Sequence, residues 1–384
     1  MRISVYTAEV PMKRDFVHAA KARSTSQSVL VRCEIAGATG WGEGAPRPYV
    51  TGETLDSAAR ALAAFDFAAV PDIEGCSDFA SGVAVLSGID FAALVGPAAG
   101  AALEIALFDA WCRAHDRDIV DAMRLIAGDC LLPRASVRAS SLVLDASREP
   151  GEYLSSMSGR ALEVLRHVKL KGMASVSRTV DDVLAVRRIV GPDVTVSVDA
   201  NGIWAPDQAC EAAARLAGLV DWIEEPTGKR DWATMARMSC PVMLDESAVS
   251  TTDIEAAAAH GAAHSVNVRV SKCGGITGSL RMIERARQLG LRCQLGVQVA
   301  EIGPLWAVGR KFAAWADGLL TVESGRQDEW FDRDLTVPAY EVDRETHCAE
   351  PLPGPGTGLA PSPKTIDSLL RRVHTRSERG CVAS

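Results

Sequence analysis

The chain has 384 residues, enough for one large domain or two. Its 41 basic and 49 acidic residues leave a formal charge of −8, which argues against a general nucleic-acid surface. The sequence has no apolar run long enough to cross a bilayer and no signal-peptide pattern near its first residue, so we expect a cytoplasmic protein without a membrane partner. Its 10 cysteines lack the Cys-x-x-Cys spacing of a zinc site and are expected to be reduced.

The first part of the chain has the pattern of strands followed by helices. Residues 1 to about 45 alternate between apolar and polar side chains, as antiparallel strands do, with a turn at residues 37–40. Helices are predicted from Thr54, a plausible N-cap, to about Phe67, and over residues 101–115. Strands followed by helices are typical of an α+β domain, so we predict an N-terminal capping domain over residues 1–125.

From about residue 134 the pattern changes to short strands that alternate with helices. Helices are predicted over residues 179–190, 207–217, 252–260, 278–289 and 304–316. The strands are predicted near Val137, Val168, Val196, Ile223, Met243, Val268, Gln294 and Leu320. Eight strands in this order favour a closed parallel barrel over an open doubly wound sheet. We therefore predict an α/β fold, a modified TIM barrel of the (β/α)7β type over residues 126–334. Residues 335–384 are expected to return to the cap and end in a frayed tail.

Three successive strands of the predicted barrel end in carboxylates: Asp199, Glu224 and Asp245. The carboxyl ends of barrel strands meet on one rim, so these side chains should converge. Three like charges would repel each other unless a cation lies between them, and an all-oxygen site suits Mg²⁺ first. Each carboxylate alone could equally be a helix cap, and Glu225 and Glu246 are expected to face away from the rim.

The strand before these carboxylates ends in Lys169-Leu-Lys171. Residues two apart in a strand share a face, so both lysines would point into the barrel mouth. A lysine beside another cation in an apolar mouth has a lowered pKa and can act as a base near neutral pH. A Lys-x-Lys pair by itself is usually a solvated surface. The prediction of a site therefore depends on the joint order of the lysines and the three carboxylates.

These motifs, together with Ser271-Lys-Cys-Gly-Gly275, resemble the enolase superfamily in its muconate-lactonizing-enzyme-like subgroup. The resemblance extends over nearly the whole chain. It implies that Mg²⁺, with Mn²⁺ as an alternative, is held by Asp199, Glu224 and Asp245. It further implies that Lys171 is the base on one face of the substrate, and that Lys169 orients the substrate carboxylate and lowers the pKa of Lys171.

The resemblance also implies a lid over a small carboxylate substrate. Cap loops are expected at residues 15–26 and 46–53, with Arg23, Arg47 and Tyr49 as their polar contacts. Asn201, Glu301 and Glu323 are further candidates for substrate binding at the rim. The seventh strand has no histidine, which argues against the mandelate-racemase-like subgroup. The family resemblance suggests a homo-oligomer.

One position departs from the resembled subgroup, which usually has a second lysine at the end of the sixth strand. This chain reads Asn267-Val-Arg269 there, and arginine stays protonated in proteins. Arg269 could stabilise an enolate, or it could form only an ion pair within the barrel. Lys272 could replace the missing base, but strand alternation turns it away from the rim.

We therefore expect an Mg²⁺-dependent enzyme that removes a proton α to a carboxylate and forms a metal-stabilised enediolate. One base favours a muconate-cycloisomerase-like isomerase, or a lyase such as a dehydratase. A first alternative is a racemase or epimerase of N-substituted amino acids or dipeptides, which needs a proton acceptor on each face of the substrate. A second alternative is a non-catalytic descendant of the fold.

Overall fold

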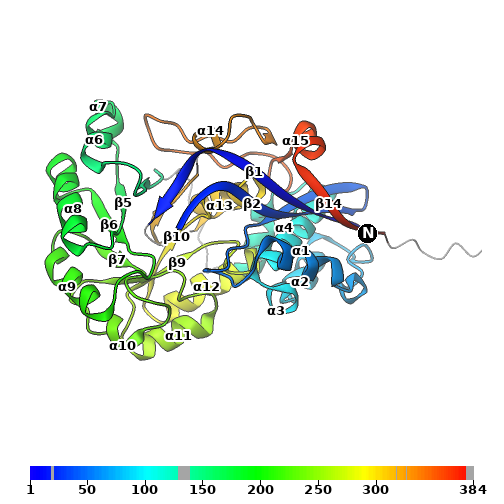
Figure 1. Ribbon diagram of the computed structural model, residues 1–384. Coiled ribbons are helices and arrows are strands. Elements are labelled where there is room, and N and C mark those ends of the chain that lie inside the picture. Colours follow the sequence, from blue (N-terminus) through cyan, green and yellow to red (C-terminus); the bar gives the residue numbers. More distant parts are fainter. Residues whose placement is uncertain (19–20, 129–138, 317, 326, 378–384) are drawn as a thin grey trace, which may run out of the picture.

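A computed structural model describes residues 1–18, 21–128, 139–316, 318–325 and 327–377. Figure 1 shows two regions side by side, a barrel in green and yellow and a cap in blue and cyan. The red C-terminal strand lies with the cap. No helix in the described ranges is both long and apolar enough to span a membrane.

The cap is an antiparallel sheet covered by helices. Its strands follow the order β14-β1-β2-β3. Its strands are β1 (Arg2–His18), β2 (Lys21–Ile35), β3 (Ala38–Gly44) and β14 (Leu370–Ser377). Its helices are α1 (Leu55–Ala64), α2 (Phe79–Ser87), α3 (Phe91–Val95), α4 (Pro97–Ala114) and α5 (Ile119–Ala127), together with the 3-10 turn η1 (Phe67–Ala69). The side chain of Thr54 accepts a hydrogen bond from Ser57 N, which confirms the predicted N-cap of α1.

Glycines in β3 let the buried helix α4 lie directly on the cap sheet. A Cβ atom added to Gly40 would stand 2.2 Å from Ala110 N, and one added to Gly42 would stand 2.0 Å from Ala102 O. Contacts this short exclude any side chain, so only glycine allows the helix and the strand to touch. The glycine spacing of residues 40–44 therefore serves packing.

The second region is the predicted parallel barrel. Its eight strands lie in sequence order, from β4 to β11. They are β4 (Leu142–Leu144), β5 (His167–Lys171), β6 (Thr195–Asp199), β7 (Trp222–Glu224), β8 (Val242–Leu244), β9 (Ser265–Val268), β10 (Arg292–Leu295) and β11 (Leu319–Val322). The helices between them are α6 (Pro150–Ser155), α7 (Gly159–Glu163), α8 (Val176–Val190), α9 (Pro206–Leu216), α10 (Trp232–Met235), α11 (Thr251–Ala259), α12 (Ile276–Gln288) and α13 (Pro304–Trp315). Ser141 N donates to Val322 O at 2.8 Å, which links the first barrel strand to the last.

Cap and barrel meet at the glycine pair after β9. Gly275 has a φ of +118°, and a Cβ there would stand 2.0 Å from Glu104 Oε2. Glu104, on α4, accepts hydrogen bonds from the backbone N–H groups of Ile276 and Thr277. A cap carboxylate thus satisfies the free N–H groups at the start of α12, which requires a residue without a side chain beside it.

Several predicted boundaries were wrong. The first barrel strand begins at Leu142, whereas the predicted centre at Val137 falls outside the described residues. Near the C-terminus the short helix α15 (Pro363–Ser368) is followed by β14. β14 pairs antiparallel with β1, from Ala8 opposite Leu370 onward, so the edge of the cap sheet sets its conformation. The remaining elements are α14 (Gln327–Trp330), β12 (Thr336–Val337) and β13 (Ala360–Pro361).

The predicted cap loop at residues 15–26 is instead the end of a long hairpin formed by β1 and β2. The hairpin extends from the cap toward the barrel mouth (Figure 1). Ala146 N donates to Val17 O at 2.9 Å, and Arg14 forms ion pairs with Asp145 at 2.5 Å and Glu329 at 2.6 Å. These contacts fasten the hairpin to the barrel at its β4 side.

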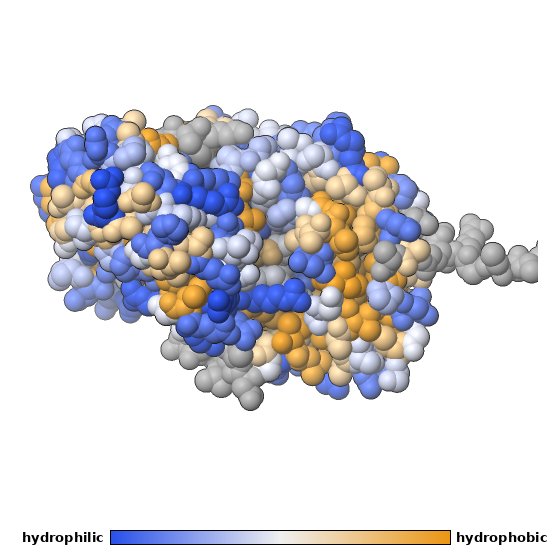
Figure 2. Space-filling model, turned by 90° about the horizontal axis from the view of Figure 1, so that it is seen from below, coloured by the Kyte–Doolittle hydropathy of each residue, from blue (hydrophilic) through white to orange (hydrophobic). Residues whose placement is uncertain are grey.

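Apolar side chains gather on one face of the cap. Figure 2, which shows the molecule from below, places this apolar surface over the cap rather than over the barrel. Leu94 on α3 is 56% exposed and Leu125 on α5 is 51% exposed. The homo-oligomer stays a prediction.

Candidate active site

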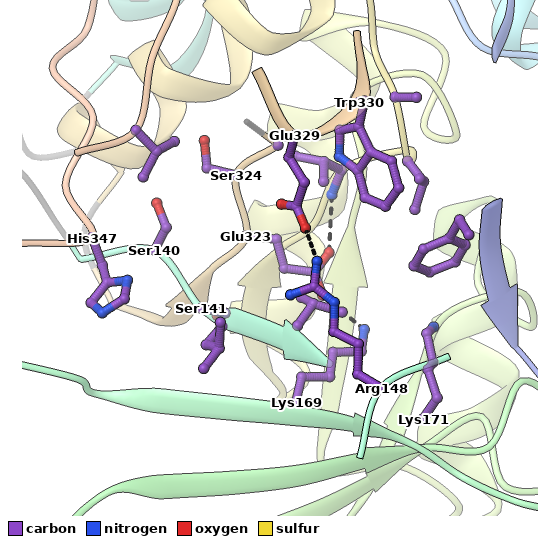
Figure 3. A pocket seen from close by; sticks show the side chains of 18 of the residues that line it. Ser140, Ser141, Arg148, Lys169, Lys171, Glu323, Ser324, Glu329, Trp330 and His347 are labelled. Atoms are coloured by element: carbon purple, nitrogen blue, oxygen red, sulfur yellow. Dashed lines mark hydrogen bonds and ion pairs between the residues drawn. The ribbon is translucent and has the colours of Figure 1, made fainter. Parts of the chain in front are cut away.

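Two lysines on β5 lie side by side at the barrel mouth (Figure 3). Lys171 is the last residue of β5 and lines a cavity of about 450 Å³. Its Nζ donates to Asp199 Oδ2 at 2.5 Å and to Asn201 Oδ1 at 3.1 Å. The same Nζ lies 5.7 Å from the centre of the Phe16 ring, which belongs to the hairpin. The ammonium group therefore has acceptors beside it and an aromatic ring over it.

Lys169 lies deeper and is only 1% exposed. Its Nζ is 2.7 Å from Glu323, 2.8 Å from Glu224 and 3.2 Å from Asp199. Burial alone would lower the pKa of Lys169, but these carboxylates raise it well above its ordinary value. Lys169 is thus a permanent cation that neutralises the acidic rim.

Asp199, Glu224 and Asp245 end three neighbouring strands and are almost completely buried. Asp199 lies opposite Glu224 in register, and Asp245 directly follows β8. Burial and the neighbouring carboxylates raise the pKa of Glu224 to about 8, although Lys169 opposes that shift. Burial also disfavours the ionised form of Asp199, but Lys171 and Lys169 lower its pKa below the ordinary value.

Asp199, Glu224 and Asp245 fit a hard divalent cation in ligand type, because all three are carboxylates. Within the described ranges, no group of three His, Cys, Asp or Glu side chains stands ready to hold a metal. The contacts give the reason. Lys169 bridges Asp199 and Glu224, and Arg269 pairs with Asp245 while lying 3.8 Å from Glu224. A metal would bind here only if these cations gave up part of their contacts.

The β9 side of the mouth carries a different kind of cation. Arg269 directly follows β9, lines the cavity, pairs with Asp245 and donates to Gln298 Oε1 at 3.3 Å. Burial opposes its charge, but Asp245 and Glu323 raise the pKa of Arg269 well above its ordinary value. Lys272 is fully buried and does not line the cavity.

Three acceptors hold Lys272 in place. Its Nζ donates to Asp245 O and Asn267 O, both at 2.7 Å, and to Asp245 Oδ1 at 3.0 Å. Lys272 therefore points away from the cavity, as strand alternation predicts, and its position in this structure leaves it no access to a substrate.

Most of the predicted substrate contacts line the cavity: Arg23, Arg47, Tyr49, Asn201 and Glu323. Glu301 does not. Its Oε1 accepts a hydrogen bond from Gln298 N at 2.7 Å, and burial beside Glu43 raises its pKa to about 8. Arg47 is 1% exposed, and burial and the charge of Arg23 lower its pKa to about 9.

The two glutamates that follow rim residues behave differently from each other. Glu225 faces away, as expected, and accepts hydrogen bonds from Asp245 N, Ser247 N and Ser247 Oγ. The prediction for Glu246 was wrong, because Glu246 lines the cavity and accepts a hydrogen bond from Asn201 Nδ2 at 3.2 Å. Glu225 thus binds the backbone N–H groups after β8, whereas Glu246 faces the cavity.

Sequence reasoning missed the outer wall of the cavity. This wall comes from the hairpin, from the segments around α6 and α7, and from the chain after β11. It includes Arg14, Phe16, Arg148, Tyr153, Glu329, Trp330 and His347. These residues come from a cap strand, two short helices and irregular chain, and they share no spacing, so no local sequence signal marks them.

Comparison with known proteins agrees with this geometry. A family profile described as "Enolase C-terminal domain-like" matches residues 153–365, more than half of the chain. The chain is 27% identical to an L-Ala-D/L-Glu epimerase of Bacillus subtilis over 78% of this chain and 81% of that protein. It is 28% identical to muconate cycloisomerase 1 of Rhodococcus opacus over 76% of this chain and 78% of that protein.

Solved structures share the whole fold. The crystal structure of an N-succinyl Arg/Lys racemase from Bacillus cereus has a TM-score of 0.80 at 24% identity, and the match covers 98% of each chain. A dipeptide epimerase from Cytophaga hutchinsonii, in complex with Mg and the dipeptide D-Ala-L-Val, has a TM-score of 0.78 at 19% identity. That match covers 97% of this chain and 98% of the other.

Proposed function

This chain belongs to the enolase C-terminal domain-like family and is an enzyme of the enolase superfamily, and we propose that it removes the proton α to the carboxylate of an N-substituted amino acid or a dipeptide. In this proposal the product is the opposite stereoisomer, so the enzyme is a racemase or epimerase. The epimerase and racemase relatives support that substrate class over the cycloisomerase that the sequence alone favoured.

The observation that carries the proposal is the position of Lys171. Its Nζ reaches the cavity from the end of a barrel strand, beside Asp199 and Asn201 and beneath Phe16. A general base must lie within hydrogen-bond reach of the proton that it removes, and Lys171 is the lysine of β5 that can approach a ligand. Lys169 cannot play that part because three carboxylates surround its Nζ.

We propose Mg²⁺, without Mn²⁺, as the metal, with Asp199, Glu224 and Asp245 as its ligands. The Cytophaga hutchinsonii epimerase contains Mg, and the oxygen-only rim of this chain suits the same ion. The metal supplies positive charge beside the substrate carboxylate, which stabilises the negative charge that develops as the α-proton leaves. Arg269 adds a second fixed positive charge at that place.

A second candidate function follows from Arg269. Inversion requires a proton acceptor on each face of the α-carbon, and a guanidinium paired with Asp245 is a poor acceptor. Lys272 is the second cation on this side, and its buried Nζ donates three hydrogen bonds. This arrangement favours a one-base reaction, either cycloisomerisation or elimination, in which Lys171 alone moves the proton.

One experiment separates the two candidates. Each enantiomer of a panel of N-acyl amino acids and each epimer of a panel of dipeptides is incubated separately with the enzyme and Mg²⁺ in D₂O. A racemase or epimerase produces the opposite stereoisomer with deuterium at the α-carbon from either starting compound. A one-base enzyme exchanges or eliminates from one stereoisomer and leaves the other stereoisomer unchanged. Absence of any reaction across the panel, from a protein that Mg²⁺ stabilises, would contradict the substrate class.

A further inference from the structure

Three neighbouring strand ends form the side of the mouth that lies across from Lys171. Glu246 follows β8, Arg269 follows β9 and Gln298 follows β10, and all three line the cavity. These strands are adjacent in the sheet, whereas β5 is the second barrel strand and β9 is the sixth. The second and sixth strands of an eight-stranded barrel lie opposite each other. A ligand that presents its α-hydrogen to Lys171 therefore turns its other face toward these three side chains.

Each of the three side chains has a buried polar atom without a hydrogen-bond partner in the described part of the chain. These atoms are Oε2 of Glu246, Nε of Arg269 and Nε2 of Gln298. The three residues are 5%, 8% and 2% exposed, respectively. Buried polar atoms normally have a partner, and leaving one unpaired is costly. A ligand that supplies the missing partners is therefore favoured at this place.

The amide of Gln298 is held so that its nitrogen is the free end. Arg269 Nη1 donates to Gln298 Oε1 at 3.3 Å, so the oxygen is occupied and Nε2 remains as a donor. Glu301 Oε1 accepts from Gln298 N at 2.7 Å, and Glu301 N donates back to Gln298 O at 3.3 Å. Ser26 of the cap donates to Ala300 O in the same turn at 2.5 Å. Cap and barrel together thus fix the backbone that carries this donor.

The free atoms match a hydroxyl group. Arg269 Nε and Gln298 Nε2 are donors, so the group that they bind must accept hydrogen bonds. A hydroxyl offers two acceptor lone pairs for these donors and one O–H for Glu246 Oε2. Because a hydroxyl both donates and accepts, it can pair with the carboxyl group of Glu246 in either protonation state. A carboxylate has no hydrogen to donate, and an ammonium group cannot accept.

We propose that the substrate carries a hydroxyl group on its β-carbon, turned away from Lys171, and that Gln298 binds this hydroxyl together with Arg269 and Glu246. The α-carboxylate lies at the rim and the α-hydrogen points to Lys171, so a substituent of the next carbon can reach the opposite side of the mouth. This inference rests on the proposed function, and it narrows the substrate class to β-hydroxy amino acids with a substituted nitrogen. Gln298 is then a specificity residue that does not touch the reacting carbon.

The first test compares side chains of nearly the same shape. N-Acetylvaline has a methyl group where N-acetylthreonine has its hydroxyl, and N-acetyl-allothreonine exchanges the methyl and hydroxyl positions. With the same configuration at the α-carbon, one of the two hydroxy compounds should show α-deuterium exchange with a kcat/KM at least about tenfold above the other two compounds, because a methyl group leaves the polar atoms unpaired. Gln298→Met removes the amide donor from a side chain of similar shape and should reduce this preference at least about fivefold.

The matched control is Gln327→Met on α14. Gln327 is 3% exposed, its amide also has no partner among the described residues, and it does not line the cavity. Its replacement should leave the preference unchanged. Gln298→Glu retains the oxygen that faces Arg269 but lacks the donor, so it should lose the preference as Gln298→Met does, in a protein whose melting curve shows that it is folded. An unchanged preference in both Gln298 variants, or equal kcat/KM values for all three compounds, would overturn the inference.

A binding measurement separates this inference from the proposed reaction. Calorimetric titration of Lys171→Ala with the three N-acetyl compounds, in the presence of Mg²⁺, requires no chemistry. We expect at least about tenfold tighter binding of one hydroxy compound, and loss of most of that difference when Gln298→Met is added. This binding preference without any exchange in the wild type would count against the proposed function alone. Equal binding of all three compounds would overturn the β-hydroxyl site, whether or not exchange occurs.

Discussion

The β5 side and the β9 side of the barrel mouth have the same plan but different chemistry. Each side has two cations, and the more deeply buried one contacts rim carboxylates. On β5, Lys171 and Lys169 both line the cavity, and Lys169 is the more deeply buried of the two. On β9, Arg269 lines the cavity and the fully buried Lys272 does not. An amine can lose a proton in a protein whereas a guanidinium stays protonated, so the two sides carry the same charge but differ in their ability to move a proton.

The two sides also differ in what their buried lysine neutralises. Lys169 lies within ion-pair distance of three carboxylates, whereas Lys272 pairs with Asp245 and otherwise bonds backbone carbonyls. The β5 lysine therefore stabilises the acidic rim as a whole, and the β9 lysine fixes one strand end. Burial and salt bridges alone do not show which residue reacts, because the most buried lysines are the least free to do so.

The largest expected effect is on stability, from Lys169→Met. Removing this cation leaves Asp199, Glu224 and Glu323 without their shared partner, which should cost about 4 kcal/mol of unfolding free energy. Lys272→Met removes one of the two cations that pair with Asp245 and leaves the pair with Arg269 in place, so the loss of stability should be smaller, at about 2 kcal/mol. Urea unfolding of both variants measures their free energies of unfolding. An equal loss of stability in the two variants would contradict the different roles given to Lys169 and Lys272.

The next effect concerns Arg269→Lys, which would give the β9 side a group able to accept a proton. If the enzyme is the one-base candidate, the stereoisomer whose α-hydrogen faces β9 should exchange slowly in the wild type and about a hundredfold faster in this variant, as expected when a general base is added. Initial rates of deuterium incorporation from each isomer measure the change. Arg269→Gln is the control, because it removes the cation without adding a base. An increase in Arg269→Gln as well would show that steric relief, rather than a base, is the cause.

Glu224 and Glu225 allow a matched test of the metal rim, because adjacent glutamates face opposite ways. In the wild type, Mg²⁺ at about 100 times its Kd should add about 2.7 kcal/mol of stability. Glu224→Gln should lose most of that increment, whereas Glu225→Gln should keep it even if its baseline stability falls. The readout is the melting temperature with and without Mg²⁺. Loss of the increment in both variants, or in neither, would contradict the assignment of Glu224 as a ligand.

The smallest effect concerns His167 at the start of β5, which lies between the hydroxyls of Ser141 and Ser197. Burial, and to a lesser degree Lys169, lower the pKa of His167 to about 3, whereas the unfolded chain should have a pKa of about 6.5. Between these values the unfolded state binds a proton that the folded state does not. Stability therefore falls as the pH falls, by up to about 1.4 kcal/mol per pH unit.

His167→Gln should flatten that slope between pH 6.5 and pH 5, when compared with His260→Gln on the exposed end of α11. Urea unfolding at several pH values measures both variants. If His167→Gln and the wild type lost stability equally over this range, His167 would not be the group that titrates on unfolding.

The strand ends of the barrel were predictable because their signals are local. Runs of β-branched residues mark the strands, and a carboxylate or lysine directly after such a run must lie on the rim. Asp199, Glu224, Lys169 and Lys171 follow from this rule, and so does the orientation of Lys272. Glu246 did not follow from it, because Glu246 lines the cavity and accepts a hydrogen bond from Asn201.

The outer wall was not predictable because it is assembled from distant segments. Arg14 and Phe16 reach the mouth only because a hairpin of the cap is longer than the sequence pattern indicated. Arg310 is an ordinary helix residue by its spacing, and its hydrogen bond to Ser140 becomes visible only in the folded structure. Sequence patterns thus indicated the chemistry of the strand ends, whereas the shape and selectivity of the cavity depend on tertiary packing.

The most direct test of the account is α-proton exchange in D₂O with Mg²⁺, in the wild type, in Lys171→Ala, and in Lys364→Ala as a control on the exposed face of α15. The account predicts that deuterium enters the α-carbon of an N-acyl amino acid or dipeptide in the wild type and in Lys364→Ala. In Lys171→Ala the rate should fall by at least about a thousandfold, as expected when a general base is lost. Exchange that persists in Lys171→Ala would contradict the central claim, because the proton would then be taken by a group other than Lys171.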